Sequence, residues 1–171
     1  MKKLRVRLGM WLIAALLPIG LLSGCAGETV VSSELPAGTF PLADLLNLDS
    51  ASITEISLAQ GDLPPIADLT EPAQIKEACA FLASVSVEPL DREMRFSEMN
   101  WSGGWGDYQL SLTYADGSEG VVKFYADAKE VWLSGRTKTG LLEEKYDIYP
   151  LAAFPETEAQ ALFSASVSSA A

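Results

Sequence analysis

A seven-residue run of strictly alternating apolar and polar side chains restricts this chain more than any other part of its sequence. Residues 108–114 read Tyr-Gln-Leu-Ser-Leu-Thr-Tyr. A period of two is typical of a β-strand with one buried face. Residues 115–118, Ala-Asp-Gly-Ser, predict a hairpin turn because Asp-Gly suits backbone positions of positive φ. The apolar run at residues 121–125 is the expected partner strand, so the fold contains an antiparallel sheet.

Further strands and one main helix are predicted around this hairpin. The strands are short apolar or alternating runs at residues 53–58, 85–88, 130–133 and 144–149. The helix follows Thr70, a candidate N-cap, and places Ile75, Cys79 and Leu82 on one face at i, i+4 and i+7. This order predicts an α+β domain, with one main helix packed on a mainly antiparallel sheet of about four to six strands.

The N-terminal segment has the pattern of a secretory signal. It begins with four basic side chains, Lys2, Lys3, Arg5 and Arg7, and continues with an uncharged run at residues 8–22. As a helix this run would span about 22 Å, which is shorter than the hydrocarbon core of about 30 Å. Length therefore favours a cleaved signal peptide, and an uncleaved membrane anchor is the alternative.

The next four residues are Leu22-Ser23-Gly24-Cys25, with leucine three positions before the cysteine and small residues between them. This motif resembles the lipobox of bacterial lipoproteins. The resemblance implies that the Cys25 thiol becomes thioether-linked to a diacylglyceryl group and that a signal peptidase cleaves between Gly24 and Cys25. Two acyl chains anchor a protein stably, since each buried methylene contributes about 0.8 kcal/mol. We therefore expect a lipid-anchored protein at the extracytoplasmic face of the cell membrane.

On this basis the chain divides into four parts. Residues 1–24 are the expected lipoprotein signal peptide, and 25–49 are the lipidated N-terminus and a flexible tether, predicted from their Gly, Ser and Pro content. Residues 50–150 form the small α+β domain. Residues 151–171 are expected to hold a short helix near residues 156–163 and a disordered tail.

Charge is distributed unevenly along the chain. Of 12 basic and 23 acidic side chains, four basic and no acidic ones fall in residues 1–24. Residues 25–171 therefore carry 8 basic and 23 acidic groups, a formal charge of −15. Nucleic-acid binding draws most of its affinity from basic contacts with phosphates. Nucleic acid is thus excluded as a partner, and the simplest role of the acidic surface is solubility.

The most unusual segment lies in a predicted loop at residues 91–107 and runs into the strand after it. It combines Trp101, Trp105, Asp107 and Tyr108 with three glycines. Flat aromatic faces beside a carboxylate bind sugar rings or cationic groups. The alternative is structural, because large indole rings also cover the end of a core. These four residues are the candidate ligand-binding residues.

Other chemistry finds little support in the sequence. There is no histidine, which removes Ser-His-Asp and Cys-His nucleophiles and histidine metal ligands. Calcium loops, phosphate-binding loops and dinucleotide fingerprints are missing too, so we expect no metal and no cofactor. Cys79 is the one cysteine besides Cys25. Its position on the apolar helix face predicts a buried thiol, and the alternatives are a reactive thiol or an intermolecular disulfide bridge.

The folded part resembles small uncharacterised extracytoplasmic lipoprotein domains of Gram-positive bacteria. The resemblance lies in residues 53–56, the approach and helix at 66–82, and the hairpin at 108–125. It brings no catalytic motif. We therefore expect a non-enzymatic binding or interaction module of the cell envelope, with an envelope protein or glycan as partner. The alternatives are a cell-wall glycoside hydrolase with paired carboxylates and a structural spacer in an envelope complex.

Overall fold

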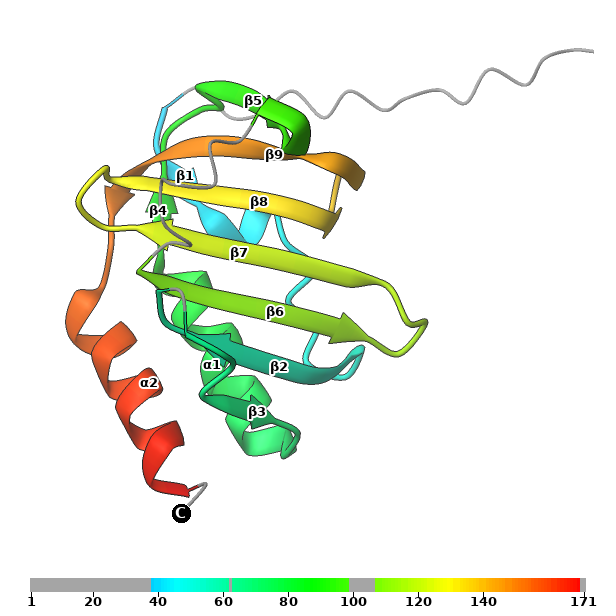
Figure 1. The fold of residues 1–171 in the computed structure, drawn as a ribbon, viewed down its shortest axis with the longest axis vertical. Coiled ribbons are helices and arrows are strands. Elements are labelled where there is room, and N and C mark those ends of the chain that lie inside the picture. The colour runs from blue at the N-terminus through cyan, green and yellow to red at the C-terminus, as the bar shows by residue number, and fades with distance from the viewer. Residues whose placement is uncertain (1–37, 62, 99–106, 170–171) are drawn as a thin grey trace, which may run out of the picture. The chain divides into compact units, whose positions relative to one another are not determined.

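The computed structural model of the chain describes residues 38–61, 63–98 and 107–169. Its elements in chain order are β1 Phe40–Pro41, η1 Leu42–Asp44, β2 Ile53–Ala59, β3 Ala67–Leu69, α1 Pro72–Ser84, β4 Ser86–Val87, β5 Arg92–Arg95, η2 Phe96–Glu98, β6 Tyr108–Tyr114, β7 Glu119–Tyr125, β8 Glu130–Thr137, β9 Gly140–Ala153 and α2 Glu156–Ser169. Strands β6 to β9 form a broad sheet with α1 behind it (Figure 1).

The described strands form one nine-stranded antiparallel sheet. Its order is β1-β4-β9-β8-β7-β6-β2-β3, and β5 also pairs with β9. The predicted α+β fold with about four to six strands and one main helix is therefore wrong. The protein is mostly antiparallel β-sheet with two short helices in its described part. The difference comes from strands of two to four residues, β1, β3 and β5, which are too short to show a period of two.

The central hairpin is confirmed. Strand β6 alternates buried and half-buried residues along its whole length, and its register sets Leu110 opposite Val122 on β7. The turn closes through a hydrogen bond from the Gly117 amide to the Tyr114 carbonyl at 2.8 Å. Gly117 has a φ of 80°, the conformation that the Asp-Gly sequence predicts.

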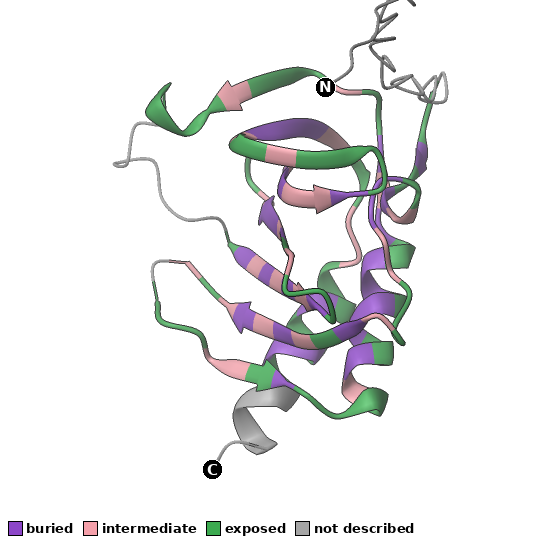
Figure 2. Cartoon of the chain, turned by 90° about the vertical axis from the view of Figure 1, so that its right-hand side faces the viewer, coloured by how far each residue is buried: buried purple, intermediate pink, exposed green. Residues whose placement is uncertain are grey.

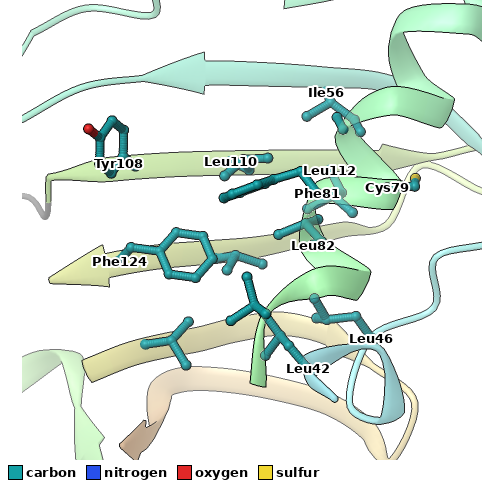
Figure 3. Close-up of a cluster of buried hydrophobic side chains, with 14 of the residues drawn as sticks. Leu42, Leu46, Ile56, Cys79, Phe81, Leu82, Tyr108, Leu110, Leu112 and Phe124 are labelled. Carbon is teal, nitrogen blue, oxygen red and sulfur yellow. The ribbon is translucent and has the colours of Figure 1, made fainter. Parts of the chain in front are cut away.

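Helix α1 packs on the sheet through the face that the sequence predicts. Ile75, Cys79 and Leu82 are all buried, and Leu82 points toward the sheet beside Leu112 (Figure 3). The helix starts one residue later than expected, with Glu71 rather than Thr70 at the N-cap. Pro72 explains this shift, because its fixed φ and missing N–H suit the first helical position.

The C-terminal segment continues the sheet and then adds a second helix. Strand β9 extends to Ala153, and α2 follows from Glu156 to Ser169. The ring of Phe163 on α2 packs edge-on against Tyr108 on β6, with 4.9 Å between centroids. Buried residues of helices and strands face one another across a single core (Figure 2).

The folded part begins before residue 50. Phe40, Leu42, Leu45 and Leu46 are buried in the core, although the sequence places them in a flexible tether. The Leu42 amide donates to the Val85 carbonyl at 2.9 Å, and β1 pairs with β4. Four buried apolar side chains outweigh the Pro and Gly residues that suggested a linker, since burial of each contributes about 2 kcal/mol.

No helix in residues 38–61, 63–98 and 107–169 is long and apolar enough to cross a membrane. The predicted signal peptide and the Cys25 anchor lie outside the described residues. The division of the N-terminal part into signal and lipidated N-terminus therefore remains a prediction.

Candidate functional site

The sheet face opposite α1 carries a row of aromatic side chains. Neighbouring residues on a strand point to opposite faces, so Trp132 points away from the core that Leu133 enters. Four rings form this row, which we call the aromatic row: Tyr125 on β7, Trp132 on β8, Tyr146 on β9 and Phe96 on η2. We call this side of the sheet, turned toward the viewer in Figure 1, the outer face.

The rings of the aromatic row touch one after another. Centroid distances are 4.5 Å from Tyr125 to Trp132, 5.6 Å from Trp132 to Tyr146 and 5.0 Å from Tyr146 to Phe96. Phe96 is 37% exposed, Tyr125 and Trp132 are half-buried, and Tyr146 is buried. Burial, followed by the nearby Tyr146 and acidic groups, raises the pKa of Tyr125 to about 12. Its phenol therefore stays neutral at physiological pH.

A chain of charged groups fixes the orientation of Trp132. The indole Nε1 donates to Glu130 Oε2 at 2.9 Å, and Arg92 Nη2 donates to Glu130 Oε1 at 2.8 Å. Arg92 Nη1 in turn donates to Asp91 Oδ2. The hydrogen bond that Arg92 donates to Glu130 is the main reason that the pKa of Arg92 is raised. These bonds hold the indole plane in place on the surface.

A cavity of about 810 Å³ adjoins the end of the aromatic row. It lies between β5, η2 and the start of β9, and Phe96 belongs to both the row and the cavity. Its other lining residues are polar or charged: Glu93, Arg95, Ser97, Glu98, Glu143, Glu144 and Lys145. The volume falls in the range of small-molecule sites.

Two carboxylates meet at one lysine beside this cavity. Lys145 Nζ lies 2.8 Å from Glu93 Oε1 and 3.4 Å from Asp147 Oδ1. Burial raises the pKa of Asp147, and the Lys145 ammonium offsets part of that rise. An ammonium between two carboxyls makes an ion-pair network, whereas a glycosidase keeps the space between its two carboxyls for substrate and water. No group of three or more Cys, Asp or Glu within the described part of the chain is placed to hold a metal ion.

The four candidate binding residues that the sequence suggests have different outcomes in the structure. Trp101 and Trp105 lie outside the described residues. Tyr108 is 7% exposed and packs against Phe163 in the core, so its ring serves the fold. Asp107 is exposed, and its Oδ2 accepts a hydrogen bond from the Ala126 amide at 2.6 Å. Asp107 and Tyr108 both line a second cavity of about 430 Å³.

Cys79 is buried in the core, as its helix position predicts. It is 7% exposed, and burial, with a smaller contribution from Asp49, raises the pKa of its thiol. Reactivity requires an accessible thiolate. We therefore expect no reaction of the native protein with 5,5′-dithiobis(2-nitrobenzoic acid), and one thiol per chain after unfolding in guanidinium chloride. A second thiol in the unfolded protein would contradict a thioether at Cys25.

The aromatic row was not predicted from the sequence. Tyr125, Trp132 and Tyr146 fall in predicted strands, and their common face becomes visible only when the register of β7, β8 and β9 is known. One sequence pattern does point to the aromatic row: each of three successive strands has a large aromatic residue directly beside a buried one.

Comparisons with protein-family models, curated proteins and solved structures found no match for this chain. Its function is therefore inferred from its own residues and their geometry.

Proposed function

We propose that this chain is a lipoprotein, anchored at the extracytoplasmic face of the cell membrane through Cys25, whose folded part is a binding module without catalytic activity. The anchor is supported by the Leu22-Ser23-Gly24-Cys25 motif after a basic and then apolar start. Attachment through two acyl chains is stable, because a single chain binds a membrane only marginally.

One observation carries the binding half of the proposal: the aromatic row is partly exposed and held in a fixed orientation. Trp132 has its Nε1–H bonded to Glu130, and Glu130 is bonded to Arg92. A group that is ordered before binding loses less entropy when a ligand arrives. Aromatic side chains also provide large contact areas with few rotatable bonds. A fixed indole on a sheet surface is thus suited to recognition.

Two features favour binding over hydrolysis. The chain has no histidine, which is the most common general base. Glu93 and Asp147, the carboxylates that meet beside the cavity, have the Lys145 ammonium near both of them. The ammonium takes the space that a glycosidase keeps between its two carboxyl groups for substrate and water.

Site-specific photo-crosslinking in intact cells tests the binding role. The full chain carries p-benzoylphenylalanine at Phe96, which belongs to the aromatic row and is 37% exposed. Benzophenone inserts into C–H bonds of proteins and glycans alike, so the partner class need not be known. We expect an adduct of higher mass after irradiation, and its loss when Trp132→Ala is added.

The control places the same photoreactive group at Leu63, which is 63% exposed. Leu63 lies in the connection between β2 and β3, at the end of the sheet order remote from β9. No adduct is expected there. Equal adducts at both positions would indicate the fixed neighbours of a structural spacer. Release of sugars from purified peptidoglycan by the full chain would contradict a purely binding role.

A further inference from the structure

We propose that two copies of this chain pair antiparallel through strand β5 and so join their sheets into one. This inference goes beyond the proposed binding function and concerns an edge of the sheet. Strand β5 is an edge strand, because among the described residues it pairs only with β9. Figure 1 shows β5 at the upper border of the sheet. An unpaired edge offers its backbone N–H and C=O groups to another strand.

The unpaired backbone groups of β5 belong to Glu93 and Arg95. These residues lie directly opposite Asp147 and Lys145 on β9. The Arg95 N–H donates to Glu98 Oε2 at 3.2 Å, so it points away from β9. Alternate residues of a strand direct their backbone groups to the same edge, which places those of Glu93 on this edge as well. Glu98 is exposed, so water can take over its side of the bond when another strand pairs with Arg95.

The sequence of β5, Arg92-Glu93-Met94-Arg95, is complementary to itself when read in the opposite direction. With a two-fold axis at Met94, Glu93 of each copy lies opposite Arg95 of the other. Both residues direct their backbone groups outward, so each of these pairs exchanges its two hydrogen bonds. Opposite charges directly across two strands stabilise their pairing. Contact of one surface with itself about a two-fold axis gives a closed dimer.

The charged side chains of this edge are available for such pairs. The Arg95 side chain is exposed and has no ion-pair partner among the described residues. Glu93 is bonded through Oε1 to Lys145 at 2.8 Å, which leaves Oε2 to accept from a second copy. Pairing therefore gives Arg95 a carboxylate partner that the described part of one chain does not supply.

The other edge strands of the described sheet do not match themselves in this way. A two-fold axis at the centre of β3, Ala67–Leu69, would set Asp68 against Asp68 of the second copy, and like charges directly opposite are destabilising. Strand β1 is two residues long and contains Pro41, which has no N–H to donate. Of these three edges, β5 is the one that favours a second copy.

The membrane supplies the local concentration that a short pairing needs. Stable interfaces usually bury at least about 1,000 Å², and three or four residues from each copy form a smaller contact. Attachment of both copies to one membrane raises their effective concentration. The proposed anchor at Cys25 provides this confinement, whereas the register depends on β5 alone. The dimer is therefore tested in membranes.

Disulfide crosslinking of the full chain in isolated membranes tests the register. Met94→Cys places one thiol from each copy at the two-fold axis, where facing Cα atoms are about 4.5 Å apart, a separation that a disulfide spans. We expect a disulfide-linked dimer after oxidation with copper phenanthroline, and peptide mass spectrometry should join the two substituted positions. Leu63→Cys, at a position that is 63% exposed between β2 and β3, should give at least about tenfold less dimer.

Exchange of charges in the Met94→Cys background tests the two ion pairs. Arg95→Glu sets carboxylates opposite each other in both pairs and should lower the amount of dimer by about tenfold. Addition of Glu93→Arg reverses both pairs and should restore the dimer. Lys145 keeps a carboxylate nearby in this double exchange, because it lies opposite position 95. Failure of the double exchange to restore the dimer, in variants whose urea unfolding matches that of Met94→Cys, would overturn the register.

A second measurement needs no new cysteine. With p-benzoylphenylalanine at Phe96, directly after β5, we expect an adduct of twice the chain mass besides the adduct with a binding partner. Absence of the dimer in both measurements, or equal dimer in Leu63→Cys, would overturn self-pairing. An adduct with another molecule but no dimer would overturn it too and leave the binding role intact. A dimer without any other adduct would support self-pairing and contradict the binding role.

Discussion

Replacement of Leu112 by alanine is expected to lower the free energy of unfolding by about 3 kcal/mol. Leu112 on β6 is completely buried and lies opposite Ile56 on β2, beneath α1 (Figure 3). Truncation removes three heavy atoms from a closely packed interior, and the surrounding sheet and helix fill the resulting cavity only in part. This substitution affects the interface that holds the helix on the sheet.

Urea unfolding followed by circular dichroism measures the effect. Leu141→Ala is the matched control, because it is the same substitution at a position that is 58% exposed in β9. We expect a change of less than about 0.5 kcal/mol in that variant. Similar losses in the two variants would show that Leu112 does not lie in the core.

Gly135→Ala is expected to destabilise the sheet by about 3 kcal/mol, at the upper end of ordinary substitutions. Gly135 on β8 has a φ of 70°, and a Cβ atom there would lie 2.2 Å from the Glu119 carbonyl oxygen on β7. It also follows the register shift between β8 and β9 that begins after Leu133. An alanine therefore incurs the left-handed backbone cost of about 1–2 kcal/mol and forces two paired strands apart.

Gly117→Ala isolates the backbone cost from the steric one. Gly117 has a φ of 80°, but a Cβ atom there would have no neighbour within 4 Å. Its loss of stability should be about 1 kcal/mol. The difference between the two variants in urea unfolding measures the close approach of β7 and β8. Equal losses would contradict that approach.

The elements that could be predicted from sequence are those with a local period. Strand β6 alternates over seven residues, and α1 presents Ile75, Cys79 and Leu82 at helical spacing. In both elements, the spacing of residues close together in the sequence is sufficient to predict the secondary structure. The turn at Asp116-Gly117 is likewise local, since it depends on the φ of one residue.

The elements that were missed are defined by their partners. Strand β5, Arg92–Arg95, has three charged side chains in four residues, a pattern that predicts a loop. It becomes a strand through backbone pairing with β9, where Glu93 also contacts Lys145 across the pair. Strand β1, of two residues, likewise exists only through its pairing with β4.

The candidate site depends even more on pairing. Trp132 lies opposite Lys123 on β7 and Ile148 on β9, which fixes its face of the sheet. Its contact with Tyr125 is diagonal across that register. A shift of one residue would turn every side chain of β8 to the other face. No local sequence pattern contains this information, so the sequence pointed instead to Trp101, Trp105, Asp107 and Tyr108.

The proposed lipid anchor at Cys25 decides where the protein acts, because two acyl chains would hold the folded part at the membrane. Intact-mass spectrometry of the protein purified from membranes of the cells that produce it tests that claim most directly. We predict a polypeptide that starts at Cys25 and carries the added mass of a diacylglyceryl group. A polypeptide that still starts at Met1, or one whose mass contains no acyl chains, would contradict the account.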